Sequence, residues 1–227
     1  MKLIYCAGRN KKLSSIAREA GFLLGARLPG KSYFPIYFAD QDWKNPDREK
    51  YMAGLKECRP VMATVLDLEH EDQFTEVMDW AEEAAQYVDR IVIIPKIPFN
   101  NIPTGVNGKQ VVLGYSVPSR YGKTTLPLSV FAGWPVHLLG GSPHLQIKYW
   151  TDFQGIADVV SLDGNMMNLM ATRRCQFWVP GTAKGARNRY WPTLDEADGY
   201  RWGKGAYIEA FRRSCENIQA EWRDILE

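Results

Sequence analysis

The chain lacks the cysteine and histidine patterns that build metal sites. Its four cysteines are scattered and form no C-x-x-C pair, and its three histidines show no H-x-x-x-H spacing. Protein zinc ligands usually occur in such closely spaced pairs. We therefore expect free, reduced thiols, no catalytic or structural metal, and no cofactor.

Long apolar runs are missing as well. No stretch is long enough to cross a membrane. The start, "MKLIYCAGRNKK", has a short apolar core but no small-residue cleavage site behind it, so we interpret it as a first strand rather than a signal peptide. Together with the reduced thiols, these features predict a cytoplasmic protein without membrane contact.

One segment resembles a phosphate-binding loop but lacks the first glycine of that motif. The stretch "GYSVPSRYGKTT", residues 114–125, ends in Gly-Lys-Thr as a G-x-x-x-x-G-K-[ST] loop would. The first glycine should stand at position 117, which is Val117. Pro118 comes next, and it has no backbone N–H to offer a phosphate. The segment therefore does not predict an NTPase.

The sequence does contain a series of short apolar runs separated by helical patterns. The runs are continuous rather than alternating, as expected for parallel strands covered on both faces. They cover residues 2–8, 35–40, 60–67, 90–96, 110–117, 135–141, 159–164 and 174–181. Helical patterns lie at residues 14–28, 46–58, 73–88, 142–154 and 206–227. With 227 residues, 45% of them hydrophobic, the chain suits a single α/β domain over residues 1–227, a TIM-like (β/α)8 barrel. A doubly wound open sheet is the alternative.

The C-terminal part is basic and rich in aromatic residues. Between residues 173 and 213 there are nine Lys or Arg against four Asp or Glu, with eight aromatic residues among them. Basic groups suit phosphates, and flat rings suit bases. We expect residues 182–205 to form a basic, aromatic insertion before the last helix. An ordinary solvated surface is the other interpretation.

Three of the predicted strands end in an acid. Asp40 closes "PIYFAD", Asp67 closes "PVMATVLD", and Asp163 closes "VVSLD". In a parallel barrel the C-terminal strand ends meet at one face, which carries the active site. A single acid there could cap the next helix. Three acids at one mouth predict a functional cluster.

Five motifs, taken in order, resemble those of the tRNA-guanine transglycosylase superfamily, including its DNA-modifying and phage-associated relatives. They are "FADQDW", "TVLDLE", "VLGYSVPSR", "HLLGGSPH" and "VVSLDGN", spread over about residues 35–175. The resemblance implies a barrel enzyme that cleaves the N-glycosidic bond of a nucleobase. Such cleavage needs one carboxylate to capture the sugar and one carboxylic acid to protonate the leaving base.

The resemblance also implies roles for the matching residues. Asp163 would be the nucleophile. The family's spacing falls nearer Asp158, but that residue opens its strand and should point to the other end of the barrel. Asp40, or Asp42 two residues later, would be the acid, and Asp67 would bind the base. The other candidate substrate contacts are Gly114, Tyr115, Ser116, Gly140, Gly141, Ser142, His144 and Asn165. The candidate nucleic-acid contacts are Arg120, Lys123, Arg173, Arg174, Lys184, Arg187 and Arg189.

Two departures from the family pattern shape the expected substrate. The chain has no zinc subdomain, which favours DNA over RNA, and no Ser-Gly-Gly comes after Asp40. The leading expectation is base exchange in DNA that inserts a 7-deazaguanine derivative, with a free modified purine base as second substrate. The alternatives are a DNA glycosylase that leaves an abasic site, a non-catalytic nucleic-acid-binding barrel, and a small-molecule enzyme that uses "GGSP" as an anion loop. A partner protein and a homodimer both stay open.

Overall fold

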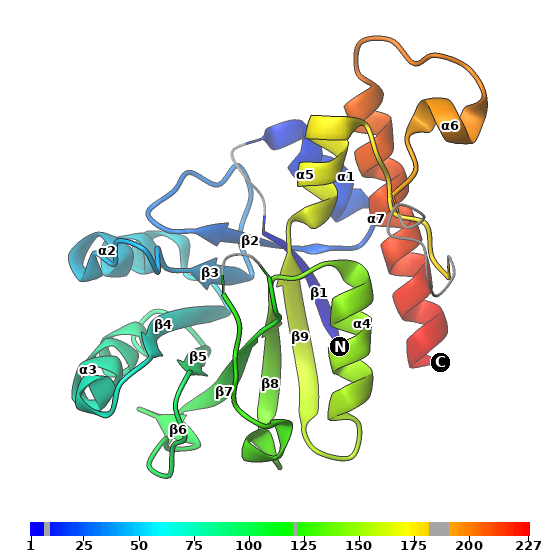
Figure 1. Cartoon of the computed structure of the whole chain (residues 1–227). Coiled ribbons are helices and arrows are strands. Elements are labelled where there is room, and N and C mark those ends of the chain that lie inside the picture. Colours follow the sequence, from blue (N-terminus) through cyan, green and yellow to red (C-terminus); the bar gives the residue numbers. More distant parts are fainter. Residues whose placement is uncertain (7–9, 120–121, 182–190) are drawn as a thin grey trace.

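A closed parallel barrel forms the centre of the computed structural model, which describes residues 1–6, 10–119, 122–181 and 191–227. The strands are arranged in the order β5-β4-β3-β2-β1-β9-β8-β7-β6, and a further pairing of β5 with β7 closes the ring (Figure 1). Every pairing in the ring is parallel, and β6 joins only β7, antiparallel to it. The structure thus confirms an eight-stranded α/β barrel and excludes the open sheet.

The elements alternate as in such barrels, but the described residues between β2 and β3, between β5 and β7, and between β7 and β8 form no α-helix. The strands are Lys2–Cys6 (β1), Leu23–Arg27 (β2), Phe38–Asp40 (β3), Met62–Leu68 (β4), Arg90–Pro95 (β5), Gly105–Val106 (β6), Lys109–Ser116 (β7), Pro135–Leu139 (β8) and Asp158–Gly164 (β9). The α-helices are Lys11–Glu19 (α1), Arg48–Cys58 (α2), Phe74–Ala84 (α3), Pro143–Phe153 (α4), Met166–Arg174 (α5), Leu194–Asp198 (α6) and Ala206–Leu226 (α7). Short 3-10 turns lie at Glu71–Gln73 (η1) and Leu128–Phe131 (η2). No helix of the described ranges is long and apolar enough to cross a membrane.

The second strand of the barrel was predicted wrongly as helix. The helix expected over residues 14–28 ends at Glu19, and Gly21 lies just beyond it with φ 98°, a left-handed conformation that favours glycine. The apolar run Leu23–Arg27 behind it is β2, which pairs with β1. Gly21 was the visible stop signal, because glycine commonly ends helices in this conformation.

The strand expected over residues 174–181 was also wrong. Cys175 ends α5 with φ 51°, and Gln176 forms only an isolated bridge with Thr193. The barrel closes one strand earlier, where β9 pairs with β1 and Asp163 stands beside Ile4. The count of eight strands was right because these two errors cancel.

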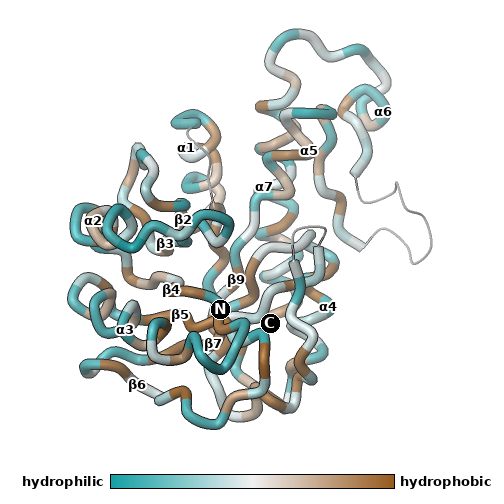
Figure 2. Tube along the Cα trace, turned by 60° about the vertical axis from the view of Figure 1, so that its left-hand side comes forward, coloured by the Kyte–Doolittle hydropathy of each residue, from teal (hydrophilic) through white to brown (hydrophobic). Residues whose placement is uncertain are grey.

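Two apolar clusters stabilise the barrel. The larger one fills the layer between strands and helices, where α7 packs on α1 and α5. Figure 2 shows the hydrophobic residues concentrated along the strands. The smaller cluster fills the barrel interior and consists of Ile4, Phe38, Met62, Val92, Ile94 and Val112. Because these apolar side chains fill the interior, a polar site that is open to solvent can form only at the strand ends.

We predict that Gly114→Ala destabilises the barrel. A Cβ at this position of β7 would lie 2.6 Å from Ile94 Cγ1 and 2.7 Å from Leu139 Cδ1. Overpacking of a filled core costs about 1–3 kcal/mol. Urea unfolding should show this loss, whereas Gly203→Ala, where a Cβ meets open space, should unfold like the wild type. Equal stability of the two variants would contradict the packing of the interior.

Candidate active site

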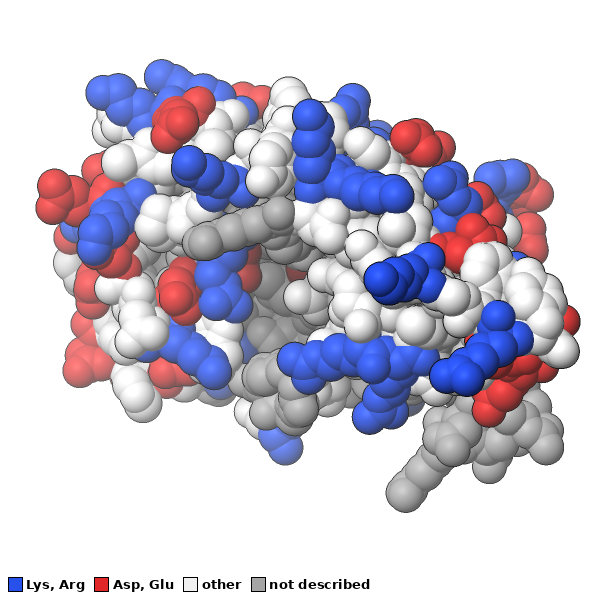
Figure 3. All heavy atoms as spheres, turned by 90° about the horizontal axis from the view of Figure 1, so that it is seen from above, with Lys and Arg blue, Asp and Glu red and all other residues white. Residues whose placement is uncertain are grey.

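Three carboxylates gather at the C-terminal ends of the barrel strands. Asp40 is the last residue of β3, Asp163 lies one residue before the end of β9, and Asp67 lies one residue before the end of β4. Asp40 interacts electrostatically with both of the others. Figure 3, which looks onto this face, shows a hollow with Lys and Arg side chains around it. The structure therefore brings the three predicted acids together.

Asp40 is a carboxyl group that holds its proton unusually well. Burial, and next the charge of Asp163, raise its pKa from the ordinary 3.8 to about 7. Thr64 opposes this shift, since its Oγ1 donates a 3.0 Å hydrogen bond to Asp40 Oδ1. The same hydroxyl oxygen accepts the backbone N–H of Gln41 at 3.0 Å, which fixes Thr64 in place. A carboxylic acid that is protonated near neutral pH is suited to general-acid catalysis.

Asp163 is held as an acceptor from two directions. Its Oδ1 accepts the backbone N–H of Gly140 at 3.1 Å and lies 3.3 Å from His137 Nε2. Gln146 on α4 fixes the local backbone, because its Nε2 donates to Gly140 O at 2.8 Å and to Asp163 O at 2.7 Å. The two acids thus occupy unlike environments: Asp40 is a buried carboxyl group with a raised pKa, and Asp163 accepts a backbone hydrogen bond.

Lys96 completes the mouth beside Asp67. Its Nζ donates a 2.6 Å hydrogen bond to Ser116 Oγ and lies 3.6 Å from Asp67 Oδ2. Burial raises the pKa of Asp67, and the charge of Lys96 opposes that rise. Both side chains remain about one-fifth exposed. This group offers a hydrogen-bond donor and an acceptor side by side at the mouth.

The Gly140–Gly141–Ser142 turn leads from β8 into α4 next to Asp163. Gly141 has φ 83°, and a Cβ there would lie 2.5 Å from Val117 Cγ1, so only glycine fits. Ser142 precedes α4, and its Oγ lies 3.1 Å from His144 Nδ1. His144 stacks on the buried Trp178 at 6.3 Å, and burial lowers its pKa. These residues shape the rim of the mouth.

Several predicted contacts lie away from the hollow. The Tyr115 ring packs in the outer layer against Phe131, Tyr149 and Phe153, and Gly114 faces the filled interior. The two residues lie on opposite faces of β7, because side chains of a strand alternate between its two faces. Asp42 is paired with Arg27 at 3.5 Å and is one-third exposed, so Asp40 is the better placed acid.

Asp158 lies at the opposite end of the barrel from Asp163. It is exposed and opens β9, whose other end carries Asp163. Of these two residues, only Asp163 lies at the mouth with the other acids.

The predicted phosphate contacts are exposed where the structure describes them. Lys123 lies in the loop behind β7, Arg173 and Arg174 form the last turn of α5, and Asn165 precedes α5 at the mouth. Arg120, Lys184, Arg187 and Arg189 lie outside the described residues, as do residues 182–190 of the expected 182–205 insertion. The described remainder of that stretch contains the short helix α6.

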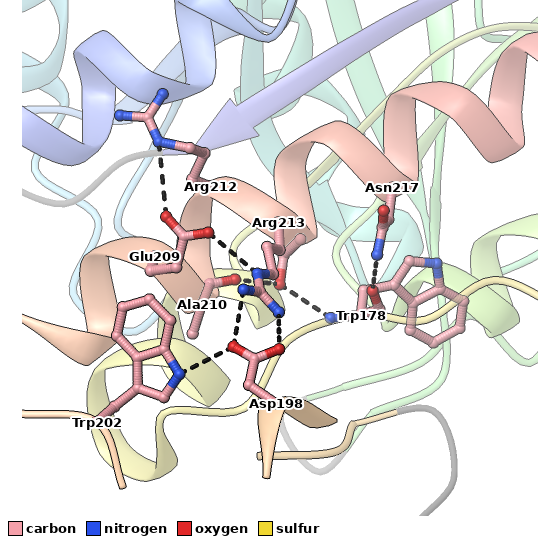
Figure 4. A network of polar contacts seen from close by, with 9 residues as sticks. Trp178, Asp198, Trp202, Glu209, Ala210, Arg212, Arg213 and Asn217 are labelled. Carbon is pink, nitrogen blue, oxygen red and sulfur yellow. Dashed lines mark hydrogen bonds and ion pairs between the residues drawn. The ribbon is translucent and has the colours of Figure 1, made fainter. Parts of the chain in front are cut away.

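Much of the aromatic and basic character of the C-terminal part is used for packing. Phe177, Trp178 and Trp191 are buried. Arg213 forms a two-pronged contact with Asp198, with both N–O distances 2.8 Å, and a 3.0 Å contact with Glu209 (Figure 4). These side chains hold α6 against α7, so they are not available to a ligand.

Residues that sequence reasoning did not assign to the site also belong to it. Thr64, Lys96 and His137 contact the three acids directly, and Cys6 hydrogen-bonds to Asp163. Lys96 stood at a predicted strand end, so its position was a usable signal. The roles of Cys6 and His137 could not be predicted, because a continuous apolar run does not show which of its side chains point into the barrel.

Comparison with known proteins assigns the chain to a family without assigning an activity. Residues 17–223 match the family described as "Family of unknown function (DUF6610)". The chain belongs to this family. The match includes Asp40, Asp67 and Asp163 and thus all three acids of the mouth. No curated protein matches the chain.

Within the part of the chain that the structure describes, no group of three or more His, Cys, Asp or Glu side chains is arranged to hold a metal ion. Cys6 is not a ready ligand either, since burial raises its pKa well above the ordinary value and only a thiolate binds metal strongly.

The pKa of Asp40 predicts a pH-dependent stability. The folded state binds this proton up to about pH 7 and the unfolded state only up to pH 3.8, so the stabilisation is full below pH 3.8 and is lost as the pH rises through about 7. At about 1.4 kcal/mol per pKa unit, the loss amounts to a few kcal/mol. Urea unfolding at several pH values should show a flatter profile for Asp40→Asn than for the wild type. Asp42→Asn, the exposed neighbour, should keep the wild-type profile; a parallel profile for Asp40→Asn would refute the assignment.

Proposed function

We propose that the protein cleaves the N-glycosidic bond between a nucleobase and its sugar in DNA and exchanges the base for a 7-deazaguanine derivative. The observation that carries the proposal is the pair of coupled carboxyl groups, Asp40 and Asp163, at the mouth of the barrel. Asp40 has a raised pKa, and Asp163 accepts a hydrogen bond from the backbone of Gly140. Pairs of carboxyl groups with unlike proton affinity are the machinery of glycosidic bond cleavage.

The two groups divide the chemistry between them. Asp163 attacks C1′ of the nucleotide, and the electron pair of the C1′–N bond leaves with the base. Asp40 donates its proton to the leaving base and is left as a carboxylate. In the second half, Asp40 takes a proton from the incoming base, whose nitrogen displaces Asp163 from C1′. The sugar configuration is retained because it is inverted twice.

Asp67 and Lys96 are suited to hold the base during this exchange. Asp67 accepts hydrogen bonds from ring or exocyclic N–H groups, while Lys96 donates to a carbonyl or ring nitrogen. A base reaches this depth only when it leaves the stack, which costs a few kcal/mol. Contacts of the rim with the polymer must offset that cost.

The exposed basic side chains of the rim suit a polyanionic partner. Lys123, Arg173 and Arg174 are exposed near the strand ends, and Figure 3 shows Lys and Arg side chains around the hollow. Trp43 lies three residues after Asp40 and is 44% exposed, the one exposed tryptophan among the described residues. Aromatic rings of this kind stack on unpaired bases. The ordered motifs that resemble the tRNA-guanine transglycosylases add support from the sequence.

A DNA glycosylase is the second candidate, because the same acid pair serves both reactions. If water rather than a second base takes C1′ from Asp163, the product is an abasic site. The shape of the mouth favours neither, since both reactions start from the same flipped base.

Asp163→Asn should abolish base release and exchange while leaving DNA binding within about twofold. The amide is nearly isosteric but cannot serve as the carboxylate nucleophile. The assay incubates the protein with single- and double-stranded DNA, with and without added 7-deazaguanine bases, and counts abasic sites and incorporated base by mass spectrometry. Asp158→Asn is the matched control on the same strand and should keep full activity. Unimpaired turnover by Asp163→Asn would overturn the assignment.

Lys123→Ala should reduce the salt dependence of DNA binding. One lost phosphate contact lowers the slope of log K against log salt by about 0.7–0.9. Filter binding over a range of salt concentrations measures that slope. Lys148→Ala removes a surface lysine that pairs with Asp152 on α4, and its slope should equal that of the wild type. If both variants behave alike, the loop behind β7 does not contact the backbone of DNA.

A further inference from the structure

An imidazole lies buried inside the barrel, directly beneath the site. His137 stands in the middle of β8, and its side chain has no exposed surface. Its ring packs on Phe38 with 4.6 Å between centroids. The inner apolar cluster surrounds this level of the barrel. A polar ring at such a place costs free energy unless both nitrogens find partners, so its contacts are informative.

The two partners of His137 define its tautomer. Nδ1 lies 2.8 Å from the buried hydroxyl of Ser161, and Nε2 lies 3.3 Å from Asp163 Oδ1. A carboxylate oxygen only accepts, so Nε2 must carry the hydrogen for this approach to be favourable. Nδ1 is then the acceptor, and Ser161 donates its hydroxyl proton to it. Within the described residues Nε2 has no hydrogen bond of regular geometry, and the carboxylate oxygen it faces at 3.3 Å is Asp163 Oδ1.

The contacts of Asp163 are unequal between its two oxygens. Oδ1 receives the Gly140 N–H and faces His137 Nε2. The Cys6 thiol also hydrogen-bonds to this carboxylate, but a thiol is a weak donor. Because the strong donors converge on Oδ1, Oδ2 is the oxygen that keeps its electron pairs available.

We propose that His137, oriented by Ser161, is a positioning residue that holds Asp163 by Oδ1 and thereby makes Oδ2 the nucleophilic atom. The inference rests on the proposed function, in which Asp163 attacks C1′. Orientation of a reacting group by a fixed partner lowers the barrier because the geometry of attack is prepared in advance. His137 itself touches no substrate, since it is fully buried.

The first experiment reads the tautomer and needs no activity. Long-range 1H–15N spectra of the 15N-labelled protein distinguish Nε2–H from Nδ1–H, and only three histidines contribute signals. His70→Gln and His144→Gln identify the His137 signals. We expect the Nε2–H tautomer in the wild type and a loss of this preference in Ser161→Ala. A wild-type Nδ1–H tautomer would overturn the proposal, because Nε2 would then face Asp163 with a lone pair.

The second experiment separates positioning from packing through the kinetics of base release. His137→Phe keeps the ring and the packing but removes the donor, so kcat should fall about 10- to 100-fold, as for groups that orient a reacting ligand, with KM nearly unchanged. His137→Gln keeps an N–H donor and should recover part of kcat. Equal rates for the two variants would refute positioning. If His137→Phe does not fold, as judged by thermal melting, the kcat of Ser161→Ala is compared with that of the wild type. A lower kcat supports positioning, and an equal kcat refutes it.

The two readouts also separate this inference from the proposed function. If the wild type releases and exchanges no base, the proposed function fails while the spectra still show whether His137 presents Nε2–H to Asp163. If base release is found but the tautomer is Nδ1–H, the proposed function stands and the positioning role is wrong.

Discussion

The pairing of β1 with β9 is the contact on which the site depends. It turns a sheet into a ring and sets Asp163 beside Ile4. In an open sheet without this pairing, β1 and β9 would form opposite edges, and the acids at the ends of β3 and β9 would not meet. Closure brings Asp40, Asp67 and Asp163 around one hollow, where the proximity of two carboxyl groups changes the proton affinity of one of them. The fold therefore creates the chemistry through geometry rather than through any single motif.

The same strands provide both the apolar interior of the barrel and its polar mouth. Ile4, Phe38 and Val92 exclude water from the interior. Asp40, Thr64 and Lys96 lie farther along the same or neighbouring strands, at the mouth. Charges placed above an apolar floor interact strongly because little solvent screens them. His137 is the exception, a polar group within the floor, and its contacts lead upward to Asp163.

Sequence reasoning found the barrel and the three acids because parallel strands impose a simple rule: a residue at the C-terminal end of an apolar run lies at the mouth. Asp40, Asp67 and Asp163 all obeyed it. The rule failed for β2, where Leu23–Arg27 continued a helical pattern and only Gly21 marked the boundary. It failed again at Phe177 and Trp178, which are as apolar as a strand but pack against α7. The register of neighbouring strands decides from which face of β7 the Tyr115 side chain projects and which residues His137 contacts. A single sequence does not encode this register locally.

The last helix gives this architecture a further property. α7 packs on α1, and β9 completes the ring with β1, so segments that lie far apart in the sequence are direct neighbours. Contacts between such distant segments close slowly, because a long loop must be ordered before they form. On the ribosome, the strands from β1 to β8 must wait as an incomplete ring with exposed edges until β9 has emerged. Asp163 therefore takes its place beside the other two acids only when β9 has joined β1, which links the formation of the site to the closure of the barrel.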